Sequence, residues 1–123
     1  MPTVCVPVTA DGQVDPRWGR AGRVAVARVD EAGEVASWEE IDVGWDRAHD
    51  ARGEGGHHAD VARFLQARSV DTVVANHMGE PMRHMLERMG VDIHLGASGG
   101  ARAAVAEALA AAAGGGAAGG PGA

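Results

Sequence analysis

Three histidines of this chain have the residue type and the placement that a metal site needs. His57 and His58 open a predicted helix, and His77 follows residues 71–76, an apolar segment that we expect to form a strand. The dipole at the start of a helix disfavours the imidazolium form, and neutral imidazole is the form that binds a metal ion. Ligands of α/β proteins gather where strands end, which is where His77 is expected. Three imidazoles with an open position would suit zinc, copper or iron, although capping or surface residues are the alternative interpretation.

The other histidines carry less weight. His49 lies in a long loop, residues 43–56, before the helix, and His94 lies on a short strand where a structural role is expected. Both stay candidates to join the site. His84 points away from the apolar face of its predicted helix, so we expect it to be exposed to solvent.

A second set of residues could hold an anion. The Gly-rich turn at residues 96–100 leads into a predicted helix, where the amides of Ser98, Gly99 and Gly100 could form an anion-binding nest. Ordinary capping by Ser98 is the alternative. Arg17 and Arg20 stand beside Trp18 in a loop, where they could surround an anionic ligand or merely pair with surface acids.

The single cysteine, Cys5, excludes an internal disulfide and an all-cysteine metal cage within one chain. It lies among valines in the first predicted strand, so we expect a buried, protonated and unreactive thiol rather than a nucleophile.

Length and composition predict one domain, residues 1–112, of a chain with 123 residues. Residues 113–123 contain only Ala, Gly and one Pro, which predicts a flexible tail. A net charge of -6 argues against binding to nucleic acid or to an acidic membrane. No apolar run reaches transmembrane length and the first residues lack the pattern of a signal peptide, so we expect a cytoplasmic protein.

The periodicity predicts an α/β fold with element order β-β-β-α-β-α-β-α. Strands are expected at residues 3–8, 23–30, 34–42, 71–76 and 91–95, and helices at 57–70, at 79–90 and after the turn at 96–100. Residues 3–8 are apolar on both faces, which predicts the central strand of a mixed five-stranded sheet covered by helices. This layout is ribonuclease-H-like. A nuclease of that fold needs an Asp within the first strand, and this strand contains no acid.

Several segments together resemble the dinitrogenase iron-molybdenum cofactor biosynthesis proteins of the NifX and NafY type. A first strand ending in Pro-Val precedes a turn like Phe-Gly-Arg-Ala, here residues 18–21. A His-containing segment then leads into a helix at His58, and a turn like Gly-x-Gly follows a strand at residues 77–79. The likeness covers about residues 3–110. It departs from the family at His77, which replaces a Gly, and at Arg17, where some members carry a His.

The resemblance implies a non-catalytic protein that binds or carries an iron–molybdenum, iron–sulfur or molybdenum–sulfur cluster. The extra histidine at position 77 makes a single metal ion a rival to a preformed cluster. The residues expected at the site are His58 and His77 as direct ligands, His57 assisting, and Arg20, Ser98, Gly99 and Gly100 offsetting negative charge. The expected partners are proteins that donate or accept the cluster, and a homodimer is compatible with this interpretation. The alternative is a regulatory or scaffold domain that acts through a protein partner.

Overall fold

A mixed five-stranded sheet organises the molecule, with β1 (Thr3–Pro7) at its centre. The computed structural model describes the backbone of residues 2–117 and the side chains of residues 2–47 and 57–111. The strand order is β3-β2-β1-β4-β5, with β1 antiparallel to β2 (Arg23–Val29) and parallel to β4 (Thr72–Val74). The prediction of a central first strand between the hairpin and the fourth strand is therefore confirmed.

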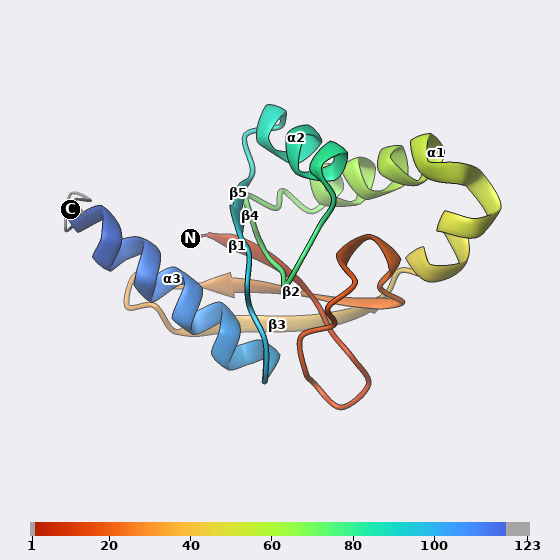
Figure 1. Ribbon diagram of the computed structural model, residues 1–123. Coiled ribbons are helices and arrows are strands. Elements are labelled where there is room, and N and C mark those ends of the chain that lie inside the picture. The colour runs from red at the N-terminus through yellow and green to blue at the C-terminus, as the bar shows by residue number, and fades with distance from the viewer. Residues whose placement is uncertain (1, 118–123) are drawn as a thin grey trace.

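The alternation of side chains along β1 explains its central position. Cys5 faces a core cluster that includes residues of α1 (Trp45–Ala67) and α2 (Glu80–Arg88). Val4 and Val6 face a second cluster that includes residues of α3 (Ala101–Ala117). Figure 1 shows the resulting three layers, with α1 and α2 on one face of the sheet and α3 on the other. A strand covered on both faces needs apolar residues throughout, as this one has.

Burial keeps the thiol of Cys5, the single cysteine, protonated. Cys5 is fully buried, and this burial raises its pKa well above the ordinary value of 9.0. The unfolded chain ionises near that ordinary value while the folded chain does not, so this contribution to stability is present below pH 9 and lost above it. We expect the free energy of unfolding to fall by about 1.4 kcal/mol per pH unit above that point. Urea unfolding between pH 7 and 10 measures the slope, and Cys5→Ala, although less stable overall, should lack it. An equal slope in both proteins would contradict the assignment to Cys5.

The predicted hairpin is present. The strand β3 (Val35–Asp42) pairs with β2 in antiparallel register, and Asp30 closes the turn by accepting backbone hydrogen bonds from Ala32 at 3.0 Å and Glu34 at 2.9 Å. Gly33 has a φ of 83°, a left-handed conformation that glycine adopts without a steric penalty.

The first helix begins earlier than the sequence predicts. The prediction of a loop over residues 43–56 is wrong, because α1 starts at Trp45. The glycines at positions 53, 55 and 56 lower the helix propensity of this stretch, which is why its sequence looks like a loop. Tertiary packing outweighs that propensity, since Trp45 is only 3% exposed and belongs to the core. His57 and His58 therefore lie within α1 and not in its first turn.

The remaining elements position the loops that follow the parallel strands. The strand β5 (Asp92–His94) pairs with β4 in parallel, so β1, β4 and β5 all end at the same edge of the sheet. The helix α3 is described as far as Ala117, and residues 118–123 of the predicted tail lie outside the described part of the chain. No helix among the described residues is long and apolar enough to cross a membrane.

Candidate functional site

A cavity of about 320 Å³ lies where β1 and β4 end, the edge at which the sequence places His77. It is lined by residues 16–20, 57–58, 77–79 and 81–82. These come from the loop between β1 and β2, from α1, from the loop after β4 and from α2. Ligands of open α/β sheets bind at such an edge, so this cavity is the candidate site.

Asp15 holds the loop that forms one wall. This buried residue accepts a hydrogen bond from the backbone N–H of Arg17 at 2.9 Å, and its own N–H donates to the carbonyl of Pro7 at 2.9 Å. The guanidinium of Arg17 donates two further hydrogen bonds to the carboxylate, both at 3.2 Å. The hydrogen bond to Asp15 raises the pKa of Arg17. The short 3₁₀ helix η1 (Trp18–Arg20) follows directly, which places Arg20 on the cavity.

Aromatic packing joins this wall to α1. The rings of Trp18 and Trp45 meet edge to face, with centroids 5.2 Å apart and planes at 70°. Trp45 also meets the ring of His57 at 6.2 Å and that of Phe64 at 5.8 Å, in both cases nearly perpendicular. Such edge-to-face pairs fix ring orientation as well as burying area. The position of His57 relative to Trp18 is therefore set through Trp45.

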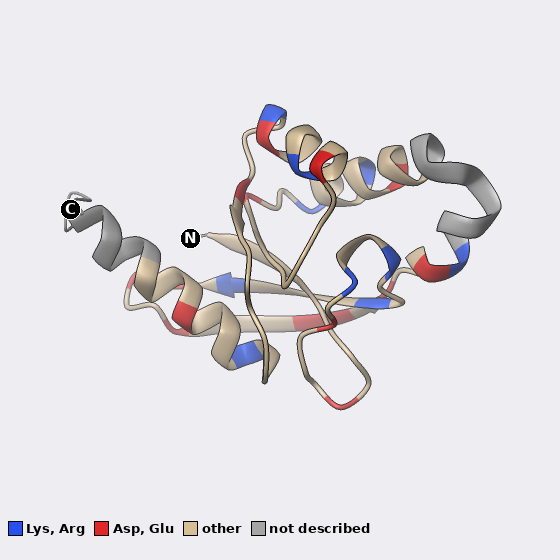
Figure 2. Ribbon diagram, viewed as in Figure 1, with Lys and Arg blue, Asp and Glu red and all other residues tan. Residues whose placement is uncertain are grey.

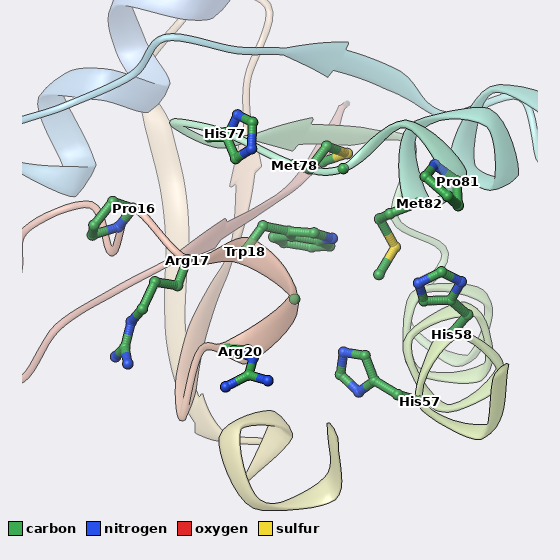
Figure 3. A pocket seen from close by; sticks show the side chains of 12 residues that line it. Pro16, Arg17, Trp18, Arg20, His57, His58, His77, Met78, Pro81 and Met82 are labelled. Atoms are coloured by element: carbon green, nitrogen blue, oxygen red, sulfur yellow. The ribbon is translucent and has the colours of Figure 1, made fainter. Parts of the chain in front are cut away.

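The three histidines line one cavity but lie at different depths. His57 is 1% exposed, His58 is half-buried and His77 is exposed at the mouth. Figure 3 shows His57 and His58 projecting from α1 on one side, with His77 on the other. The ring centroids of His57 and His58 are 6.1 Å apart. Because both residues lie inside α1, the dipole of a helix start does not act on them as the sequence predicts.

A single ion does not fit the three imidazoles as they stand. Among side chains 2–47 and 57–111, no three His, Cys, Asp or Glu residues gather closely enough to hold one metal ion. A ligand that touches all three histidines must therefore be larger than one ion.

The described residues that line the cavity carry cationic and soft neutral groups, and none of them is a carboxylate. They include two arginines, three histidines and the thioethers of Met78 and Met82. Basic positions gather in the loop between β1 and β2 and at the start of β2, as Figure 2 shows. A hard cation such as magnesium prefers carboxylate ligands, which are missing among the described residues of this lining. An anion, or a soft metal bound within an anion, suits it better.

Sequence reasoning missed the two methionines and the indole of Trp18. Met82 belongs to the apolar face of α2, and such a position by itself indicates a core residue. In the structure Met82 belongs to the core and also lines the cavity. Only the approach of α2 to η1 and α1 reveals the second role. The signal in the sequence was that the apolar face of this predicted helix begins directly after the loop of His77, which was already expected at the site.

The structure places Ser98, Gly99 and Gly100 away from the cavity. The carbonyl of Gly99 accepts a hydrogen bond from the N–H of Val14 at 2.8 Å, and the N–H of Ala101 donates to the carbonyl of Gly12 at 2.9 Å. These hydrogen bonds join the turn to the loop after β1, so the backbone of the turn holds these two segments together. The proposed site therefore does not include these three residues.

The other histidines also lie elsewhere. His84 is exposed on α2, as predicted, and His94 is half-buried beside Ser98 in a separate hollow. The side chain of His49 lies outside the described residues.

Comparison with known proteins agrees with this architecture. A solved structure of the apo form of the orange protein from Desulfovibrio gigas has a TM-score of 0.70 and 25% identity, over 89% of this chain and 88% of that one. An NMR structure of a candidate NifB protein from Thermotoga has a TM-score of 0.64 and 24% identity, over 94% and 90%. A candidate dinitrogenase from Methanocaldococcus jannaschii shares the fold at a TM-score of 0.56 and 10% identity, over 85% and 84%. No protein with a curated description matches the sequence.

The match to a family is more extensive. The family described as dinitrogenase iron-molybdenum cofactor matches residues 1–112, which include every described residue that lines the cavity. The chain belongs to the dinitrogenase iron-molybdenum cofactor family.

Proposed function

We propose that this protein binds and carries an anionic metal–sulfur cluster in the cavity at the edge of its sheet. Arg20, His57, His58 and His77 would hold the cluster, with His58 and His77 as direct ligands and Arg20 offsetting its charge. The family description points to handling of the iron–molybdenum cofactor. The cluster is cargo, taken from one protein and passed to another.

The lining of the cavity is the observation that carries the proposal. A metal–sulfur cluster presents sulfide atoms and negative charge at its surface, which cations and hydrogen-bond donors stabilise. Imidazole and thioether groups are ligands that transition metals accept. The volume of about 320 Å³ accommodates a group of several atoms, and its opening at His77 gives a path for transfer.

Residues of the sheet support a binding role over hydrolysis. The strand order supports our inference that the fold is ribonuclease-H-like. In nucleases of that type the first strand bears a carboxylate that binds metal. Here Val4, Val6 and Val8 are buried in the core beneath α3 and Cys5 in the core beneath α1 and α2, positions with no capacity to bind or activate a metal-bound water.

We place this function in the cytoplasm, where donor and acceptor proteins of such clusters would meet the carrier. A homodimer is compatible with the proposal.

The test is binding of tetrathiomolybdate, an anionic molybdenum–sulfide complex, by protein purified without a histidine tag. We expect its visible absorption to remain with the protein through gel filtration, with matching molybdenum content. A protein that stays colourless and free of molybdenum would contradict the carrier function and favour a scaffold acting through a protein partner.

Substitutions of the histidines test whether the probe binds in this cavity. We expect His58→Ala and His77→Ala each to weaken tetrathiomolybdate binding by about tenfold, the value of one charge-assisted contact. The double substitution should cost less than the two effects added together, because both side chains contact one ligand. His84→Ala is the matched control, since His84 is exposed on α2 and does not line the cavity. Equal losses in the control and the site variants would contradict the assignment.

A further inference from the structure

Trp18 presents a buried polar group to the cavity. Its side chain is 1% exposed, and its indole Nε1 has no hydrogen-bond partner among the residues that the structure describes. The residue lines the cavity, and Figure 3 shows the indole nitrogen at the end of the ring directed toward the side chains of α1 and α2. An indole N–H that is buried almost always finds an acceptor, so a donor without one at a cavity wall requires explanation.

The ring has little freedom to find an acceptor by turning. Its edge-to-face packing on Trp45, with centroids 5.2 Å apart, fixes the plane of the indole. The adjoining Gly19 faces the side chains of α1 and α2, since a Cβ at that position would lie 3.5 Å from Nε2 of His57 and 3.7 Å from Cε of Met82. The N–H is therefore held at the inner end of a cavity whose described lining residues include no carboxylate.

The chemistry of the indole decides what can occupy that end. The indole N–H only donates a hydrogen bond and cannot coordinate a cation. The positive end of its dipole faces the ligand, so a bare metal ion is disfavoured there. An oxide or sulfide atom with negative charge is favoured, because hydrogen bonds to charged acceptors are the stronger kind.

We propose that the indole N–H of Trp18 donates a hydrogen bond to a sulfide or oxide atom of the bound cluster, so that the inner end of the cavity recognises the anionic surface of the cargo. The inference rests on the proposed function and adds to it a residue that selects a sulfide- or oxide-bearing metal complex over a free metal ion. Trp18 orients the ligand, while the imidazoles reach it from α1 and from the mouth.

The experiment compares Trp18→Phe with Trp38→Phe, using tetrathiomolybdate as the probe. Phe keeps the aromatic packing of position 18 and removes the N–H. Trp38 is the matched control, because it lies on β3 away from the cavity and its indole donates to Glu40 at 3.1 Å. We expect Trp18→Phe to remain folded and to bind the probe about tenfold more weakly, with Trp38→Phe unchanged.

Nuclear magnetic resonance of protein with ¹⁵N-labelled tryptophan supplies a second readout. The Trp18 indole resonance, assigned by its loss in Trp18→Phe, should shift when the probe binds, while the Trp38 resonance stays in place. Unchanged affinity in Trp18→Phe, or an unmoved Trp18 resonance, would overturn the inference and leave the carrier function standing. A wild-type protein that does not bind the probe would overturn both.

Discussion

Replacing Arg20 with Glu is expected to weaken tetrathiomolybdate binding by about a hundredfold or more at low ionic strength. The change removes a positive charge from the cavity wall and puts a negative one in its place, facing an anionic ligand. Charges a few ångströms apart near a protein surface interact by a few kcal/mol. Reversing the charge at position 20 should therefore lower the affinity by at least about a hundredfold. Titration followed by visible absorption measures the affinity.

Two further variants show whether the effect is local. Arg20→Lys keeps the charge and should retain most of the affinity. Arg102→Glu changes the net charge of the chain by the same amount, but Arg102 stacks over the ring of Trp38, 4.7 Å from its centroid, and does not line the cavity. If Arg102→Glu weakened binding as much as Arg20→Glu, overall charge and not the cavity would govern affinity. Salt should weaken wild-type binding and have less effect on Arg20→Glu.

Adding a side chain at Gly19, which would occupy part of the cavity, is expected to weaken tetrathiomolybdate binding in proportion to its size. Gly19 has no positive φ, so a side chain can be added without straining the backbone. An Ala methyl would meet His57 and Met82 at 3.5 and 3.7 Å, which is ordinary contact. A Leu side chain would extend further into the cavity. We therefore expect Gly19→Ala to bind the probe weakly, and Gly19→Leu to bind it about a hundredfold or more weaker than the wild type, because several contacts between probe and cavity would be lost.

Gly100 provides the control for this change. It also lacks a positive φ, and a Cβ there would meet no atom within 4 Å. We expect Gly100→Leu to bind tetrathiomolybdate like the wild type, with circular dichroism confirming that each variant is folded. Binding that survives in Gly19→Leu and fails in Gly100→Leu would move the site from the cavity to the turn at residues 96–100.

The sequence alone determined the architecture of the sheet. Alternation with period two is a local pattern, and in β1 it indicated burial on both faces, which only a central strand has. The same reasoning placed His77 at the end of β4 and Arg20 in the loop after β1, both at the edge where the cavity lies. Parallel strands end at one edge by geometry, so these positions follow from the order of elements.

The tertiary structure alone decided which groups face one another. The start of α1 depends on the packing of Trp45 against Trp18, and this contact outweighs the low helix propensity of the glycines that follow it in the chain. The turn at Gly99 joins the loop after β1 through backbone bonds that its sequence does not encode. Met82 and the indole of Trp18 reach the cavity only because α2 and η1 approach each other. Local patterns reflect the period of an element, whereas the composition of a cavity depends on contacts between residues far apart in the chain.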